Sequence, residues 1–107
     1  MKTILSGLWL LAALSTFSSA ALAIEELWVD VRSLEEHRED HIEGHIHIPF
    51  KQINKEIGKY ADDKDVIIKL YCKSGGRAGI AKKALEDLGY SRVVNLGGIS
   101  SVRAIAK

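Results

Sequence analysis

The chain has 107 residues, enough for one domain with a single modest hydrophobic core. Its 15 lysines and arginines nearly balance 14 aspartates and glutamates, so the net charge is +1, and 47% of the residues are hydrophobic. This composition excludes a disordered chain, and the lack of an internal repeat excludes a solenoid. The sequence has no stripe of alternating basic and aromatic residues, so nucleic acid is not an expected partner.

The N-terminal segment has the features of an export signal. Lys2 supplies a positive charge, residues 3–17 form an almost unbroken apolar run, and the small residues that follow end at Ala23. The alternative is a retained membrane helix, but the run is short for a membrane span and lacks charges on its far side. We therefore expect a signal peptide at residues 1–23, cleaved after Ala23 or two residues before it. The mature domain, residues 24–107, would then be periplasmic or secreted and free of the membrane.

The first half of the mature domain predicts two short strands and a short helix. Residues 27–31 are mostly apolar and predict a buried strand. Ser33 is followed three residues later by Glu36, a capping box that predicts a brief helix through about Arg38. Residues 46–48 alternate between apolar and polar side chains and predict a second strand, which ends at the following proline.

The second half predicts two more strands and three helical segments. Apolar residues at helical spacing within residues 50–57 predict a helix that ends near Gly58. Residues 66–71 are apolar enough for a central strand buried on both faces. The next helix ends at Gly89, and residues 92–96 predict the last strand, before two glycines and a short helical tail. The apolar stripe of that helix consists of Ala78, Ala81, Ala84, Leu85 and Leu88. Alternating strands and helices predict an α/β fold, with a parallel sheet covered by helices on both faces.

Cys72 is the single cysteine of the chain, and it lies at the end of the predicted central strand. One cysteine cannot form an intramolecular disulfide, and the alternative role of a small buried hydrophobe would be filled as well by alanine. Gly75 and Gly76 let backbone N–H groups turn toward the sulfur, and the following helix dipole, with Lys73 and Arg77, favours a thiolate. The C-terminal half of the mature domain carries eight basic and two acidic residues, which favours a small anionic substrate.

Four segments, taken in chain order, resemble the rhodanese domain and in particular its short exported single-domain members. They are WVDVR at 28–32, HIEGHIHIP at 41–49, YCKSGGR at 71–77 and GYSRVVNLGG at 89–98. Together they span nearly the whole mature domain, so the resemblance implies a single rhodanese-like α/β domain at residues 24–107. The chain departs from the family pattern where proline, alanine, asparagine and serine are replaced by Glu43, His45, His47 and Ala78.

The resemblance implies a thiosulfate sulfurtransferase, an enzyme that moves a sulfane sulfur from a small anionic donor to cyanide or a thiol. Cys72 would be the catalytic nucleophile and would carry the sulfur as a persulfide. Backbone N–H groups of the following loop would hold the negative charge and its two cations would orient the donor, so the implied substrate-binding residues are Lys73, Ser74, Gly75, Gly76 and Arg77. The resemblance implies no metal and no bound cofactor, and we expect a monomer.

Two other functions stay open. Phosphatases and arsenate reductases of the same fold have a loop one residue longer, whereas here only four residues separate the cysteine from the arginine. The second alternative is a non-catalytic exported carrier of sulfur or metal, with His41, His45 and His47 as metal ligands and the last two on one face of a strand. Asp30 and Arg32 are interpreted as a structural ion pair, because persulfide transfer requires no carboxylate.

Overall fold

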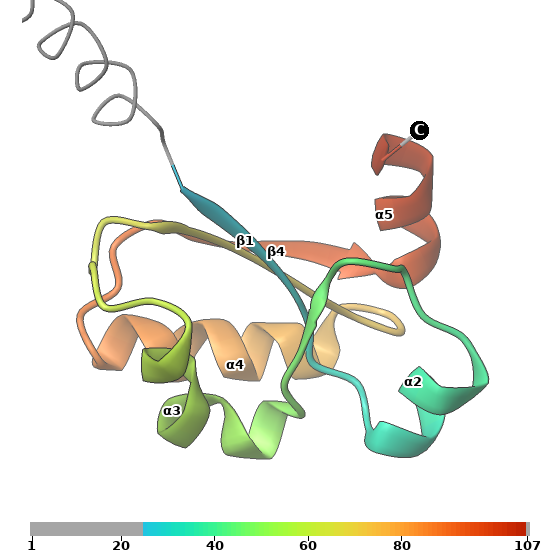
Figure 1. Ribbon diagram of the computed structural model, residues 1–107, viewed down its shortest axis with the longest axis horizontal. Coiled ribbons are helices and arrows are strands. Elements are labelled where there is room, and N and C mark those ends of the chain that lie inside the picture. The colour runs from blue at the N-terminus through green and yellow to red at the C-terminus, as the bar shows by residue number, and fades with distance from the viewer. Residues whose placement is uncertain (1–24, 107) are drawn as a thin grey trace, which may run out of the picture.

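The computed structural model describes residues 25–106, so the predicted signal peptide lies outside the described residues (Figure 1). Strands and helices alternate along the chain: β1 (Glu26–Asp30), α2 (Leu34–Glu39), β2 (Ile46–His47), the 3-10 helix η3 (Phe50–Gln52), α3 (Ile53–Glu56), the 3-10 helix η4 (Ile57–Lys59), β3 (Ile67–Cys72), α4 (Gly76–Asp87), β4 (Val93–Gly98) and α5 (Ile99–Ala106). Within residues 25–106, no helix combines the length and the hydropathy needed to span a bilayer.

The four strands form one parallel sheet in the order β2-β1-β3-β4. The central strands β1 and β3 pair with Asp30 opposite Tyr71, so their carboxyl ends lie at the same edge of the sheet. An irregularity interrupts the pairing of β3 with β4 after Leu70, and the pairing resumes with Cys72 opposite Gly98. The predicted parallel α/β sheet is confirmed, and Cys72 lies at the edge where open sheets of this kind bind ligands.

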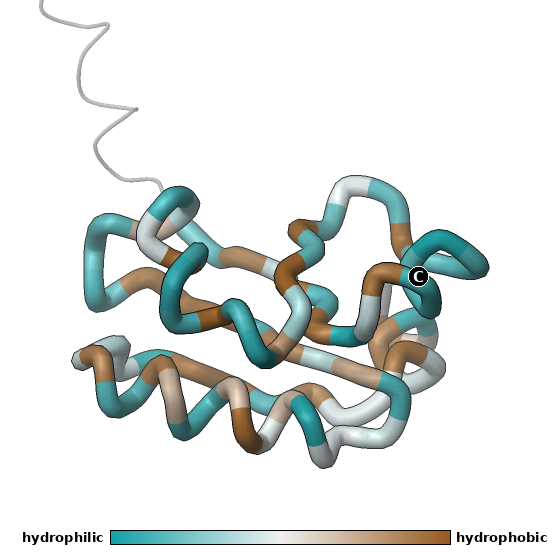
Figure 2. The backbone as a smooth tube through the Cα atoms, turned by 90° about the horizontal axis from the view of Figure 1, so that it is seen from below, coloured by the Kyte–Doolittle hydropathy of each residue, from teal (hydrophilic) through white to brown (hydrophobic). Residues whose placement is uncertain are grey.

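The larger part of the hydrophobic core lies between the sheet and the helices α3 and α4 (Figure 1). Figure 2 shows apolar segments along the strands beside α4 and mostly hydrophilic loops around them. Ala78, Ala81 and Leu85 of α4 are fully buried, as the apolar stripe predicted. Leu88 was included in that stripe but is 42% exposed, because it is the C-cap residue at which the helix ends.

The helix predicted for residues 50–57 forms as three consecutive short segments, η3, α3 and η4. Its apolar face is as expected, because Ile53 and Ile57 are each only 1% exposed and Phe50 packs against the same core. These segments and α4 contact each other and cover one face of the sheet.

The opposite face of the sheet is covered by α5 near the carboxyl ends of the strands (Figure 1). Ile99 and Val102 of α5 pack on the buried ring of Tyr71. Toward the amino ends of the strands the same face is polar, with Lys69 Nζ 2.8 Å from Glu26 Oε1. Helices therefore cover both faces, as predicted, but α5 covers the smaller part.

Candidate active site

Cys72 is the last residue of β3, and residues 72–77, which we call the cysteine loop, lead from this strand into α4. Gly75 has a φ of +103°, a left-handed conformation that glycine adopts without strain. Because the chain turns back at this residue, the Gly75 N–H donates a hydrogen bond of 3.0 Å to Cys72 Sγ. Cys72 is 1% exposed, so its sulfur lies at the base of the loop.

The cysteine loop favours the thiolate form of Cys72. Burial raises the pKa of the thiol, but backbone hydrogen bonds lower it by a larger amount, so the pKa lies below its ordinary value. Gly75 donates the hydrogen bond of 3.0 Å, and the nearby N–H groups of Ala78, Ser74 and Arg77 lower the pKa as well. Ala78 was not a predicted site residue. From the sequence it was considered only as a replacement of serine, which removes a hydroxyl group, and its backbone N–H was not considered. A cradle of backbone donors can hold a negative charge on sulfur without any particular side chain.

The remaining predicted residues of the loop lie at its mouth. Lys73, Ser74 and Gly76 are exposed, and Gly76 is the first residue of α4. Gly76 has no positive φ and a side chain there would meet no atom within 4 Å, so the backbone itself does not require a glycine at this position. The conformational argument for glycine applies to Gly75 alone.

The end of β4 holds the cysteine loop in place. The Asn95 side-chain amide donates to the carbonyl oxygen of Gly75 at 2.9 Å, and Asn95 Oδ1 accepts from the Gly97 N–H at 2.9 Å. Gly98 lies so close to the loop that a Cβ atom there would overlap the carbonyl oxygen of Lys73. None of these three β4 residues was a predicted site residue. In the sequence, the only feature that marks these residues is that they lie in segment 89–98, one of the four segments on which the family resemblance is based.

Arg77 closes the loop, but its guanidinium group is bound to Glu36 of α2. Two parallel hydrogen bonds join them, from Nη1 to Oε1 at 2.6 Å and from Nη2 to Oε2 at 3.0 Å. The pKa of Glu36 is lowered to about 2, chiefly by the hydrogen bond from Arg77 and also by the backbone and side chain of Ser33, against the opposing effect of burial. Glu36 was predicted as half of a capping box with Ser33, and that capping box is present. Its second role, as the partner of Arg77, was not predicted.

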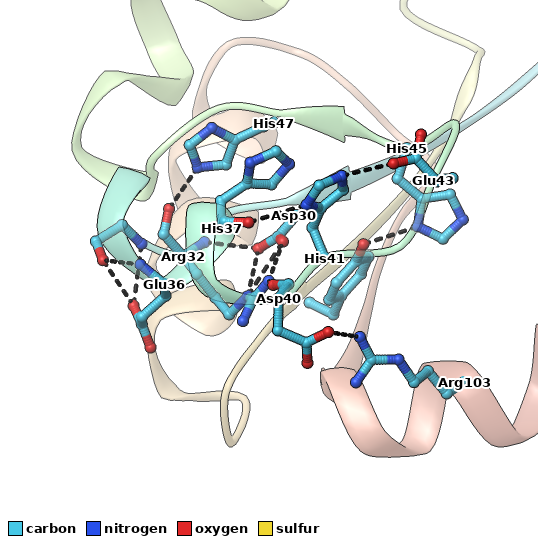
Figure 3. A network of polar contacts seen from close by, with 12 residues as sticks. Asp30, Arg32, Glu36, His37, Asp40, His41, Glu43, His45, His47 and Arg103 are labelled. Carbon is cyan, nitrogen blue, oxygen red and sulfur yellow. Dashed lines mark hydrogen bonds and ion pairs between the residues drawn. The ribbon is translucent and has the colours of Figure 1, made fainter.

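A cleft of about 350 Å³ opens beside the cysteine loop, between α2 and the start of α5. Its lining is polar except for one side chain, and consists of Arg32, Glu36, Glu39, Asp40, Lys73, Ile99, Ser100 and Arg103. Figure 3 shows Arg103 extending from α5 to Asp40, and their ion pair has an Nη2–Oδ1 distance of 2.6 Å. Of the cysteine loop, Lys73 lines the cleft directly, and Glu36, which also lines it, binds Arg77 at the other end of the loop.

Asp30 and Arg32 form the buried ion pair that the sequence predicted (Figure 3). Arg32 Nη2 lies 2.7 Å from Asp30 Oδ2 and also donates to the carbonyl oxygen of Asp40 at 2.6 Å. The two side chains are 1% and 6% exposed. Since Arg32 joins the end of β1 to the end of α2, the pair holds two segments together beside the cleft.

The histidines form a different arrangement from the one considered as a metal site (Figure 3). The rings of His41 and His47 each stack on His37, with centroids 4.2 Å apart, and we call these three residues the histidine stack. His45 stacks instead on Trp28 and its Nδ1 lies 2.7 Å from the Tyr71 hydroxyl. His45 and His47 do lie on the same side of the chain, as predicted, because Ile46 and Ile48 turn to the core on the other side, but β2 starts only at Ile46 and the two rings have different partners. Within the described part of the chain, no three His, Cys, Asp or Glu side chains are placed to hold a metal ion.

Three comparisons with known proteins agree with this geometry. Residues 13–104 match the family described as Rhodanese-like domain. Thiosulfate sulfurtransferase PspE of Escherichia coli (strain K12) is 38% identical over 93 residues, which are 87% of this chain and 88% of that protein. The solved structure of a rhodanese with anions from E. coli, 38% identical, superposes with a TM-score of 0.67 over 71% of this chain and 89% of that one. Thiosulfate sulfurtransferase from Pseudomonas aeruginosa, 31% identical, gives a TM-score of 0.70 over 77% of this chain and 16% of its own.

Proposed function

This chain belongs to the rhodanese-like domain family and is a sulfurtransferase, and we propose that it carries the transferred sulfur as a persulfide on Cys72. A sulfurtransferase binds a sulfur donor and an acceptor in turn. The observation that carries the proposal is the hydrogen bond from the Gly75 N–H to the buried Cys72 sulfur at the end of β3, in a loop whose backbone N–H groups lower the pKa of the thiol. A thiolate at this position is a nucleophile at neutral pH, and it needs no general base to activate it.

In the proposed first half-reaction, the Cys72 thiolate attacks the outer sulfur of thiosulfate. A new S–S bond forms, the S–S bond of thiosulfate breaks, and sulfite leaves with the bonding electron pair. The product is a Cys72 persulfide whose outer sulfur carries the negative charge. The N–H groups of the cysteine loop that favour the thiolate also favour this anion, since they present fixed dipoles that need no reorganisation.

In the proposed second half-reaction, the acceptor attacks the outer sulfur of the persulfide. Cyanide leaves as thiocyanate, and a thiolate acceptor leaves as its own persulfide. In both cases the S–S bond to Cys72 breaks and the electron pair returns to Sγ, so the thiolate is regenerated. No electrons are gained or lost overall, and the cycle requires no oxidant or reductant.

The substrate-binding roles divide between backbone and cations. We propose that the backbone of Ser74, Gly75 and Gly76 forms the surface that the donor contacts when it approaches Cys72 Sγ. Lys73 is exposed and forms no ion pair within residues 25–106, so its charge is available to an incoming anion. Arg77 keeps a positive charge beside the loop, while its bond to Glu36 fixes the direction of the guanidinium group.

We further propose that the protein is exported, with residues 1–23 as its signal peptide and residues 24–107 as the mature domain. The sequence pattern at the N-terminus supports this proposal. Small anions such as thiosulfate and cyanide would then reach the enzyme outside the cytoplasm. The basic character of the C-terminal half of the chain, which contains the cysteine loop, would favour their approach.

The experiment is a steady-state thiosulfate:cyanide assay of the purified mature protein beside the Cys72→Ser variant. Wild type is expected to form thiocyanate, and the variant to be inactive, because a serine alkoxide does not form at neutral pH and carries no sulfur. Mass spectrometry after incubation with thiosulfate alone should find one added sulfur atom on the Cys72 peptide.

Three results would contradict the proposal. Residual activity of Cys72→Ser would exclude Cys72 as the sulfur carrier. Loading of sulfur without turnover would favour the non-catalytic carrier. Hydrolysis of p-nitrophenyl phosphate in place of thiocyanate formation would favour the phosphatase-like chemistry of the same fold.

A further inference from the structure

The cysteine loop joins two layers of the fold, and its central hydrogen bond runs between them. The sulfur belongs to Cys72, the last residue of β3, whereas the Gly75 N–H that donates to it at 3.0 Å belongs to the N-cap residue of α4. Figure 1 shows α4 lying along one face of the sheet. The geometry at the sulfur therefore depends on where the start of the helix lies relative to the strands. Hydrogen bonds within α4 do not fix this position, because they hold the helix only relative to itself.

The chain of the loop is poorly suited to hold the position by itself. Gly75 is followed directly by Gly76, and two consecutive glycines have more backbone freedom than any other pair of residues. Both lie at the start of α4, where the first N–H groups of a helix have no partner within it. Donors that are to stay in place around an anion therefore need a constraint from outside the loop.

Asn95 provides such a constraint from β4. Its Nδ2 donates to the Gly75 carbonyl oxygen at 2.9 Å, and the same oxygen accepts the first hydrogen bond of α4 from the Gly79 N–H at 2.9 Å. Both lone pairs of this carbonyl are thus used, and because the peptide group is planar, its orientation is fixed from two directions. β4 pairs with β3 with Asn95 opposite Leu70, so Asn95 is tied to the strand that carries Cys72.

The other end of the Asn95 amide has a partner of its own, which fixes the side chain. The Gly97 N–H, in the irregular stretch where β4 pairs with β3, donates to Asn95 Oδ1 at 2.9 Å. An amide group is required for both contacts together, since one needs a donor and the other an acceptor. The space around it is limited by glycines: a Cβ at Gly79 would lie 3.6 Å from Nδ2, and a Cβ at Gly75 would lie 3.9 Å from Oδ1.

From these contacts we propose that Asn95 is a positioning residue of this sulfurtransferase, which holds the start of α4 against the sheet so that the N–H donors of the cysteine loop stay on the Cys72 sulfur. The proposal rests on the persulfide mechanism above and adds to it a residue that acts through Gly75 rather than on the reacting sulfur. Asn95 is an exposed residue of β4, which lies at the edge of the sheet, and at such a position most polar side chains would be interchangeable. The two contacts of its amide make it specific.

The first test measures the acidity of Cys72 before any sulfur is transferred. Asn95→Ser keeps an oxygen that can accept from the Gly97 N–H, but its side chain is one bond shorter and has no amide to donate to the Gly75 carbonyl. The midpoint of iodoacetamide alkylation against pH should rise by about half to one pH unit, a threefold to tenfold change in the acidity constant. Asn95→Asp also keeps the acceptor and loses the donor, and it should move the midpoint at least as far, since its charge opposes the thiolate.

The second test follows single-turnover loading of sulfur from thiosulfate. In both Asn95 variants the maximal loading rate should fall by about tenfold, because the N–H donors are displaced. The thiosulfate concentration at half-maximal rate should stay within about twofold of wild type, because the exposed Lys73 still attracts the anion. Val94→Thr is the matched control, since Val94 is an exposed neighbour on the same strand and has no hydrogen-bonding side chain, and it should match wild type in both tests.

The outcomes separate this inference from the proposed function. If Asn95→Ser is folded by urea denaturation and its alkylation midpoint equals that of Val94→Thr, Asn95 has only a structural role and the inference is overturned, while the persulfide mechanism stands. If Asn95→Ser does not fold, Asn95→Asp decides the question in about 1 M salt, where the added charge is screened. If wild-type protein cannot be loaded with sulfur, the proposed function has failed, and the alkylation midpoints still show whether Asn95 positions the N–H donors.

Discussion

The cysteine loop and the histidine stack both lie near the carboxyl edge of the sheet, yet they are built in opposite ways. The loop brings N–H groups from a few consecutive residues around one sulfur, and those groups belong to the backbone. The stack brings together three side chains from α2, the connection after it and β2. A site made by local backbone geometry can be anticipated from a glycine pattern, whereas a site made by side chains from separate segments depends on how the segments pack.

The difference extends to how each region holds a charge. In the loop, burial and hydrogen bonding oppose each other at Cys72, and hydrogen bonding has the larger effect, so the charged form is favoured. In the stack, burial lowers the pKa of His37, and the neighbouring His47 and His41 lower it further, so the neutral form is favoured. The first region is arranged for an anion, and the second disfavours a cation. The predictions below test the two regions in turn, from the largest effect to the smallest.

The largest effect is expected from Gly98→Ala, which acts on the loop from outside. Its Cβ would overlap the carbonyl oxygen of Lys73, so the loop must shift. We expect kcat/KM for thiosulfate to fall by about a hundredfold, since a shift of about 1 Å misplaces the N–H donors, and the free energy of unfolding to fall by about 1–3 kcal/mol. Thiocyanate formation and urea denaturation measure the two effects.

Gly58→Ala is the matched control for this variant. Gly58 has no positive φ, and a Cβ there meets no atom within 4 Å, so its kinetics should be those of wild type. If the two alanine variants have equal activity, the packing of β4 does not position the loop.

The next effect separates the two cations of the loop. Arg77→Ala should lower kcat/KM tenfold to a hundredfold, about 1.4–2.7 kcal/mol, because it removes both a charge and the connection to α2. Lys73→Ala should mainly raise KM and weaken its dependence on salt, since an exposed charge steers the donor more than it positions it. Equal kinetics for wild type and Arg77→Ala would contradict the role given to the arginine.

Glu36→Gln tells whether that role is positioning or direct binding. It weakens the ion pair with Arg77 but keeps an acceptor for the Ser33 N–H, so the capping box is retained. A loss in kcat at unchanged KM would show that Arg77 acts by holding the loop against α2. A fall in KM would show instead that Glu36 competes with the donor for the guanidinium group.

A smaller effect concerns the acidity of Cys72. Because the backbone N–H groups lower its pKa, the rate of alkylation by iodoacetamide should rise with pH to a midpoint below the reference value of about 8.5. In Gly98→Ala the midpoint should move upward as the donors are displaced. A wild-type midpoint at or above the reference would mean that the N–H groups do not stabilise the thiolate.

The smallest effect concerns the histidine stack. The pKa of His37 is lowered in the folded protein, so the unfolded chain binds more protons and stability falls as the pH decreases below about 6.5. Burial lowers this pKa most, His47, His41 and Arg32 lower it further, and Asp30 raises it. His37→Phe keeps an aromatic ring without a titrating group, so its melting temperature should depend less on pH between about 7 and 5 than that of wild type.

Arg38→Gln, an exposed change on the same helix, serves as the control for this measurement. If His37→Phe and Arg38→Gln show the same dependence of melting temperature on pH, His37 does not contribute to the acid sensitivity of the fold.

Much of the fold was predictable because its signals are local. The capping box at Ser33 and Glu36, the buried strand before Cys72 and the glycine at the end of α4 each determine structure within a few residues. The prediction was wrong for Leu88. Its spacing matches the apolar stripe of α4, but the helix ends at this residue and the side chain is exposed.

The sequence by itself determined the α/β alternation, the position of Cys72 between a strand and a helix, and a turn at Gly75 and Gly76, because these follow from hydrophobic period and backbone freedom. Only the tertiary structure decided that Arg77 faces Glu36 and that β4 anchors the loop through Asn95 and Gly98. The physical reason is distance along the chain. Contacts between α2, the cysteine loop and β4 exist only once the parallel sheet brings the ends of its strands to one edge.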